Sequence, residues 1–193
     1  AIFFFFLKRD GEKVNKNSFG YILGFMLVLC VLFGTGVSFV HYSTQEMLEK
    51  NVAMHTNKIL SQVFMIEPDT KDAEGYRNVV ENNLNQDTIL TDSHTWKIYR
   101  YPSNNRIGFE FSGMGFWDRI TGILVLSDDL QTIENIGIIE QKETPGLGAR
   151  IEEKRFTDQF KDMTIDWGGP ESERVVIAQP GQESGENAVD AIT

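Results

Sequence analysis

The longest apolar run of the chain lies near its start. Between Phe19 and Val40 there is no charged side chain, and about 20 apolar residues are enough for a helix to cross a hydrocarbon core roughly 30 Å thick. The pattern predicts a transmembrane helix over residues 19–40. A cleaved signal peptide is the competing interpretation, but its apolar region is shorter and ends at a small-residue cleavage site, which is not evident here.

The charges on either side of this run predict its orientation. Four basic residues precede it, and the next lysine or arginine after it is Lys50. Because positive charge accumulates on the cytoplasmic side of a span, we expect residues 1–18 in the cytoplasm and the rest of the chain outside it. The basic residues before the run are Lys8, Arg9, Lys13 and Lys16.

Helical periodicity continues beyond the apolar run. Leu48, Val52, Ile59 and Val63 recur at the spacing of one helical face, which predicts a helical stalk that ends at Pro68. A second, mostly polar helix is predicted from Tyr76, Val79, Val80 and Leu84, ending before a loop at residues 91–93. Residues 41–90 are therefore interpreted as a stalk leading into a domain at residues 91–193.

From Trp96 the period changes to that of strands. Alternation at Ile107, Phe109 and Phe111, an apolar run at residues 123–126 and a further run at residues 133–139 predict an antiparallel meander. An amphipathic helix around Phe156 and Phe160 and a strand at residues 175–178 follow. The predicted class is α+β: an N-terminal transmembrane helix, then an antiparallel sheet with flanking helices.

Charge and composition exclude several functions. From His41 onward, 14 lysines and arginines face 26 aspartates and glutamates, a formal balance of −12. Such an acidic surface repels phosphate backbones, so no nucleic-acid partner is expected. One cysteine excludes an intrachain disulfide framework, and three scattered histidines do not match zinc spacings. Redox chemistry would therefore need an organic cofactor.

Two glycine-containing segments are candidates for binding one. Residues 113–118 contain a GxG that lacks a third glycine and leads into a strand, so this is no dinucleotide fingerprint. Its glycines allow close backbone approach and Trp117 offers a flat apolar surface; a plain β-turn with a core tryptophan is the competing interpretation. In residues 143–148, Pro145 and two glycines free backbone amides and hold Leu147 outward, where a planar ring can pack.

A third segment, residues 189–193, places Thr193 after the acidic Asp190. Alone it indicates only a helix start or a frayed end. Together, in this order and downstream of the anchor, the three segments resemble the FMN-binding domain shared by the G subunit of Rnf complexes and the C subunit of sodium-pumping NADH:quinone reductases (Nqr). The most specific stretch of the resemblance is residues 142–151.

The resemblance implies a covalent flavin. In that family the third segment continues as Ser or Thr, Gly, Ala, Thr, and a flavin transferase joins the last threonine to FMN through a phosphoester. Thr193 matches the first hydroxyl position, so the acceptor threonine is expected about three residues after Thr193. The alternative register makes Thr193 itself the acceptor.

The resemblance also implies roles for individual residues. We expect Thr144 and the amides of residues 146–148 to hydrogen-bond the flavin, Leu147 and Trp117 to pack on its ring, and Asp190 to order the attachment turn. Glu143 either orients the loop, polarises the flavin edge or is a solvated charge. The expected cofactor-binding residues are Gly113, Gly115, Trp117, Asp118, Glu143, Thr144, Gly146, Leu147, Gly148, Asp190 and Thr193, with no catalytic residue and no metal ligand.

The implied function is that of an electron carrier. The chain would work with other membrane subunits of an Rnf- or Nqr-type complex that couples redox to Na⁺ or H⁺ transport in a bacterial or archaeal membrane, and not as a stand-alone catalyst. A sensory or regulatory membrane protein with the same FMN domain is the alternative, but such proteins usually carry more spans and cysteine-rich clusters. An anchored hydrolase or lectin-like domain would need a catalytic pair or carbohydrate-facing aromatics, which the sequence does not offer.

Overall fold

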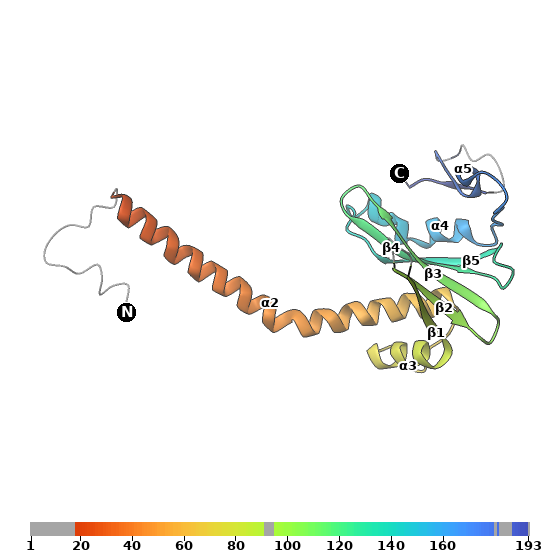
Figure 1. Ribbon diagram of the computed structural model, residues 1–193, viewed down its shortest axis with the longest axis horizontal. Coiled ribbons are helices and arrows are strands. Elements are labelled where there is room, and N and C mark those ends of the chain that lie inside the picture. The colour runs from red at the N-terminus through yellow and green to blue at the C-terminus, as the bar shows by residue number, and fades with distance from the viewer. Residues whose placement is uncertain (1–17, 91–94, 180, 182–186, 193) are drawn as a thin grey trace, which may run out of the picture. The chain divides into compact units, whose positions relative to one another are not determined.

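A computed structural model describes residues 18–90, 95–179, 181 and 187–192 (Figure 1). Two units are compact by themselves, residues 1–49 and residues 50–193. The elements are α2 (Phe19–Val63), α3 (Ala73–Asn83), β1 (Asn85–Leu90), β2 (Thr95–Tyr101), β3 (Arg106–Met114), β4 (Arg119–Leu126), β5 (Ile133–Glu140), η1 (Gly148–Glu152), α4 (Lys154–Thr157), η2 (Asp158–Phe160), α5 (Glu171–Arg174), β6 (Val176–Ala178) and β7 (Ala188–Asp190).

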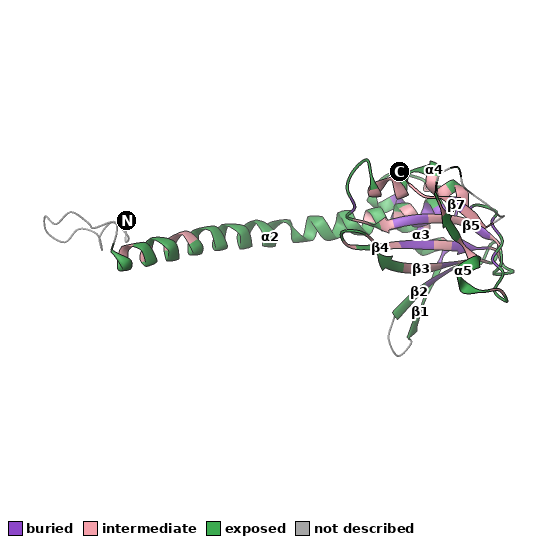
Figure 2. Ribbon diagram, turned by 90° about the horizontal axis from the view of Figure 1, so that it is seen from above, coloured by how far each residue is buried: buried purple, intermediate pink, exposed green. Residues whose placement is uncertain are grey.

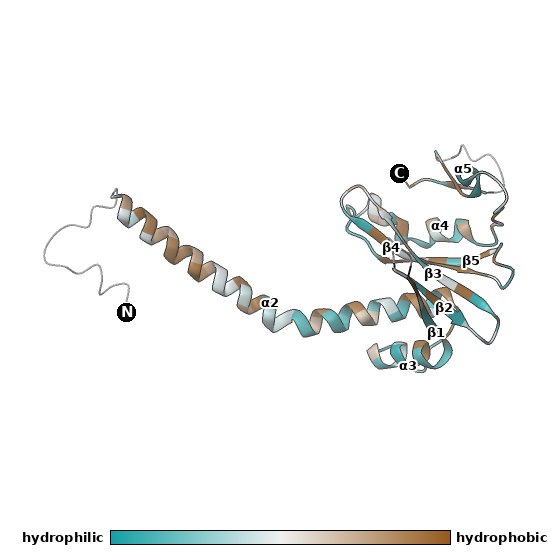
Figure 3. Cartoon of the chain, in the orientation of Figure 1, coloured by the Kyte–Doolittle hydropathy of each residue, from teal (hydrophilic) through white to brown (hydrophobic). Residues whose placement is uncertain are grey.

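The first unit consists of the N-terminal part of helix α2. Among the described residues, α2 is the one helix long and apolar enough to cross a membrane by length and composition. Its large side chains, including Phe19, Phe33 and Phe39, are exposed, and Figure 3 shows them as a brown stretch that ends where the helix becomes polar. The apolar side chains surround the helix instead of forming one stripe, which is typical of a helix in an apolar solvent.

The second unit begins with the C-terminal part of α2, so the predicted helical continuation is confirmed. Ile59 and Val63 pack against the sheet, whereas Leu48 and Val52 of the same predicted face are exposed. A Cβ added to Gly137 of β5 would lie 2.6 Å from Val63 Cγ1. The helix therefore lies directly on β5, at a position where the strand has no side chain.

Helix α2 ends at Val63, five residues before Pro68, so the predicted end was wrong. The amide of Met65 donates to the carbonyl of Gln62 at 3.1 Å, and the amide of Ile66 donates to that of Ser61 at 2.8 Å. These two bonds form a Schellman motif, which requires a left-handed residue between helix and loop. Met65 occupies that position with φ of 56°.

The sheet has five strands in the order β1-β2-β3-β4-β5, and every neighbouring pair is antiparallel. The predicted meander is confirmed. Strand β4 lies between β3 and the edge strand β5 (Figure 2), and its side chains alternate between two cores. Ile123 and Val125 pack with the end of α2 and with α3, whereas Leu126 packs with Phe160 and Val189. Burial on both faces explains why residues 123–126 are continuously apolar.

Three predicted elements differ from the structure. Residues 85–90 form strand β1, which the sequence did not indicate because all six of its residues are exposed and show no alternation. The helix expected around Phe156 and Phe160 is broken into α4 and η2, with the two rings 5.3 Å apart. Residues 188–190 form strand β7, parallel to β6, instead of a helix start.

The left-handed conformation of Met65 generates a prediction about stability. Met65→Gly should raise the free energy of unfolding of the full chain in detergent by about 0.5–1 kcal/mol, because glycine adopts positive φ without steric cost. The matched control is Gln62→Gly, an exposed position in the last turn of the same helix, which should lower it by about 1 kcal/mol. Loss of stability in both variants would contradict the left-handed assignment.

Candidate functional site

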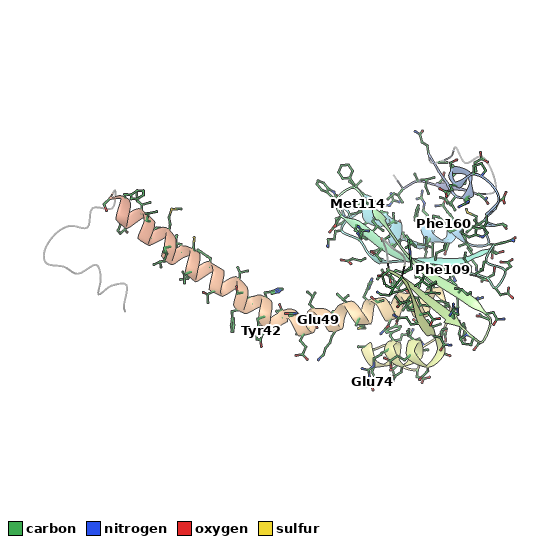
Figure 4. All side chains as sticks on the ribbon, in the orientation of Figure 1. Tyr42, Glu49, Glu74, Phe109, Met114 and Phe160 are labelled. Carbon is green, nitrogen blue, oxygen red and sulfur yellow. The ribbon has the colours of Figure 1, made fainter. Side chains whose placement is uncertain are left out.

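The topology of the meander brings two of the three predicted segments together. Strand β5 ends at Glu140, which pairs with Thr121 near the start of β4. The turn between β3 and β4 therefore lies at the same end of the sheet as the loop that follows β5. Figure 4 marks this end by the label on Met114, the last residue of β3.

Trp117 joins the turn to the loop through both of its N–H groups. Its indole Nε1 donates to Thr144 Oγ1 at 2.9 Å, and its backbone amide donates to Glu143 Oε1 at 3.1 Å. The turn itself is closed by the Gly115 amide, which donates to the Asp118 carbonyl at 2.9 Å. The indole is thus fixed at its polar edge while 66% of the residue is exposed.

Glu143 lies between two of the predicted glycines. It is 9% exposed, and a Cβ on Gly115 would lie 2.3 Å from its Oε1. A Cβ on Gly148 would lie 2.8 Å from Glu143 Cβ and 2.9 Å from Oε2. Both glycines are therefore required for the close approach of this side chain, and Glu143 orients the loop instead of being a solvated charge.

An ion pair also joins the β3–β4 turn to the loop after β5, and we call these two segments together the turn–loop junction. Lys142 Nζ lies 2.7 Å from Asp118 Oδ2 and 3.7 Å from Glu140 Oε1. The hydrogen bond from Lys142 lowers the pKa of Asp118 below its usual value, and the same bond raises the pKa of Lys142. Both groups therefore stay charged, although the exposure of the pair makes it a weak contribution to stability.

The loop after Glu143 turns sharply and displays its leucine. Gly146 has φ of 76°, and the Thr144 carbonyl accepts hydrogen bonds from the amides of Leu147 and Ala149 at 3.1 and 3.2 Å. The Leu147 amide is therefore used within the turn, which corrects the expectation that it is free for a ligand. The side chain is 61% exposed, as the sequence predicted.

The third predicted segment meets a different part of the domain. The Asp190 amide donates to Gln159 Oε1 at 2.6 Å, and Gln159 Nε2 donates to the Asp190 carbonyl at 3.3 Å. The Asp190 carboxylate accepts from the Gly181 amide at 2.9 Å, so it contacts the loop that follows β6, and its expected role in the attachment turn stays a prediction. The contribution of Gln159 was missed, because no local pattern shows that its amide pairs with a strand 31 residues later.

A depression of about 330 Å³ lies beside this segment. Asp190, Ala191 and Ile192 line it together with two cations, Arg150 and Arg155. Arg150 follows Gly148 by two residues and forms an ion pair with Glu153 at 3.3 Å. The depression therefore connects the helical turn after the glycine loop to the last described residues of the chain.

The structure brings eight of the eleven predicted site residues together. Six of them form the turn–loop junction or its ion pair, and Gly146 and Leu147 complete the loop. Asp190 lies apart from them, at the depression. Gly113 is in β3 with nothing within 4 Å of an added Cβ, and Thr193 lies outside the described residues. The six at the junction are Gly115, Trp117, Asp118, Glu143, Thr144 and Gly148.

Comparison with known proteins agrees with this geometry. Residues 115–193 match the FMN-binding domain family. This part of the chain is an FMN-binding domain. The match begins at the first glycine of the junction and includes every predicted site residue except Gly113, so the resemblance to the Rnf and Nqr subunits is confirmed.

Two relatives represent both branches of the resemblance. The G subunit of an ion-translocating oxidoreductase complex from Haemophilus influenzae (strain 86-028NP) is 26% identical over 151 residues, 75% of this chain and 66% of the relative. The C subunit of a Na⁺-translocating NADH-quinone reductase from Pasteurella multocida (strain Pm70) is 28% identical over 83 residues, 43% of this chain and 32% of the relative. The chain spans just under two thirds of the Haemophilus relative.

The fold of most of the chain is that of a solved structure. The crystal structure of the C subunit of Na⁺-translocating NADH-quinone reductase from Parabacteroides distasonis ATCC 8503 has a TM-score of 0.60 at 21% identity, and the match covers 78% of this chain and 83% of the other. This confirms the predicted α+β architecture with an antiparallel sheet and flanking helices.

The glycines around Glu143 generate a prediction. Gly148→Ala should lower the free energy of unfolding by about 1–3 kcal/mol, because the new methyl group overlaps the Glu143 side chain and disturbs the bond to the Trp117 amide. Gly113→Ala is the matched control, since its methyl group would meet open space. Equal effects in denaturant unfolding of the full chain would show that the junction does not depend on the close approach at Gly148.

Proposed function

We propose that the chain is the membrane-anchored, FMN-carrying electron-transfer subunit of an ion-translocating oxidoreductase complex of the Rnf or Nqr type. The FMN-binding domain at residues 115–193 and the names of its relatives support this. Bound FMN supplies electron-transfer chemistry, while the protein supplies position and polarity. The subunit works within the complex and is not a stand-alone catalyst.

One observation carries the proposal. Two large apolar side chains, Trp117 and Leu147, are exposed. Both residues are hydrogen-bonded to Thr144, Trp117 through its indole and Leu147 through its backbone amide. A soluble domain gains nothing from fixing such side chains in water, whereas a planar ring system packs well against them. In our proposal they contact the isoalloxazine ring, and the Thr144 hydroxyl, which accepts from the indole, keeps a proton to donate.

The phosphate end of the cofactor suits the depression beside Asp190. Arg150 and Arg155 line it together with the carboxylates of Glu153 and Asp190, and Arg150 pairs with Glu153. Guanidinium groups are well matched to phosphate oxygens, so in our proposal the two arginines hold the phosphate. Ile192 also lines it, so the chain leaves this point toward the acceptor threonine, which we expect about three residues after Thr193 and which a flavin transferase would modify. The residues present therefore fit FMN at both ends.

Location and partners follow from the same proposal. Helix α2 is the membrane anchor, the N-terminus is cytoplasmic by its basic residues, and the FMN-binding domain is extracytoplasmic. A dissociable flavin would be lost there, which gives covalent attachment a physical reason. The partners are the other membrane subunits of the complex, and the transported ion is Na⁺ or H⁺.

Covalent attachment gives a direct test. The full-length protein from its native host should keep in-gel flavin fluorescence after denaturation and washing. Since residues 175–193 contain no lysine or arginine, the tryptic peptide that begins at Val175 should carry the mass of FMN less one water. Thr193→Val should keep the flavin if the acceptor lies downstream and lose it if Thr193 is the acceptor. Complete release of colour on denaturation would reject covalent attachment.

A second test concerns Leu147. Leu147→Ala removes apolar contact worth about 1–3 kcal/mol from the surroundings of the ring and admits water, so the flavin spectrum and midpoint potential should shift. The melting temperature should change little, because the side chain is exposed. Leu130→Ala, an exposed leucine in the β4–β5 turn, should leave the flavin unchanged. A large fall in melting temperature with an unaltered flavin would make Leu147 a structural residue.

A further inference from the structure

The turn between β3 and β4 exposes more apolar surface than one flavin ring needs. Besides Trp117, it presents Phe116 at 85% exposure and Met114 at 76%. Neither belongs to the two hydrophobic cores of the domain. We call Met114 and Phe116 the hairpin tip. With an aromatic side chain contributing roughly 150–250 Å² when covered, Phe116 and the neighbouring Met114 form an exposed apolar surface that the flavin does not need.

The hairpin tip is held in place although it is exposed. The turn is closed by the bond from the Gly115 amide to the Asp118 carbonyl, and the Trp117 amide is bound by the buried Glu143. The Phe116 ring packs edge-on against the Trp117 ring at 5.1 Å. An apolar group that is already fixed loses little conformational entropy on binding, and anchors of protein interfaces have this property.

The charge of the domain selects among the possible occupants. Residues from His41 onward carry a formal charge of −12, so a second copy of the chain, which has the same charge, is repelled. Around the tip itself, Lys142 and Arg119 balance Asp118 and Glu140. A partner protein with an apolar pocket would fit the exposed tip, and lysines or arginines around that pocket would attract the acidic domain.

We propose that the hairpin tip, Met114 and Phe116, is the docking contact for the subunit that exchanges electrons with this domain. The inference rests on the proposed function, because the indole of Trp117 connects the tip to Thr144 and a protein seated on Phe116 therefore lies beside the flavin. The partner is a protein that presents an apolar socket rimmed by basic side chains. In this proposal Trp117 and Leu147 contact the flavin, whereas Met114 and Phe116 contact the partner protein.

Site-specific crosslinking in the native complex tests the contact. A photoreactive phenylalanine derivative at position 116 should crosslink to another subunit of the complex, identified by mass spectrometry, and the yield should fall as salt screens the charges. The same derivative at Ile177, an exposed apolar position in β6, should give no such product. Crosslinking of position 116 to lipid, to a second copy of the chain, or to no subunit would overturn the inference.

Electron exchange separates this inference from the proposed function. In the purified complex, the double variant Met114→Ser and Phe116→Ser should keep its flavin content and spectrum but lose about tenfold or more in the rate of reduction or reoxidation of its flavin. Ile177→Ser should change neither the flavin content and spectrum nor the rate of flavin reduction or reoxidation. If the unaltered protein carries no flavin, the proposed function fails. If it carries flavin and the double variant exchanges electrons at the normal rate, only the docking inference fails.

Discussion

The buried carboxylate of Glu143 is the contact on which the geometry of the proposed flavin site depends. It accepts from the Trp117 amide and fits between Gly115 and Gly148, where any side chain would displace it. A buried carboxylate is costly unless its oxygens are hydrogen-bonded, so this bond favours the arrangement in which the turn and the loop lie together. Without the carboxylate the Trp117 amide would lose its partner, while the bond from the indole to Thr144 and the ion pair of Lys142 with Asp118 would remain.

The sheet makes this small junction stable. Because β4 is buried on both faces, the strands that carry the turn and the loop cannot move relative to one another without opening a core. Within the second unit, the C-terminal end of helix α2 packs directly on β5 at Gly137, and β5 leads into the loop that contains Glu143.

The sequence predicted the parts of this arrangement that have local signatures. The apolar run at residues 123–126 indicated a strand of the meander, and Pro145 with two glycines indicated a loop that displays Leu147. The sequence could not decide between the alternatives for Glu143, because its burial depends on Gly115, which is 28 residues away in sequence and reaches it only through the meander. Gly113 and Gly115 look equivalent in the sequence, yet only Gly115 is crowded. Strand β1 has no apolar face, so no periodicity marks it.

A carrier that passes electrons between proteins must meet two opposing requirements. Its cofactor has to be held firmly enough that geometry changes little when charge changes, which favours a site preorganised by hydrogen bonds. It also has to stay near the surface, where a partner can approach. The turn between β3 and β4 meets both, since the backbone of residues 115–118 is bonded on its inner side while Phe116 and Met114 face outward. An attached flavin would then lie between a rigid support and an exposed apolar contact, so the protein that docks there needs no opening motion to reach it.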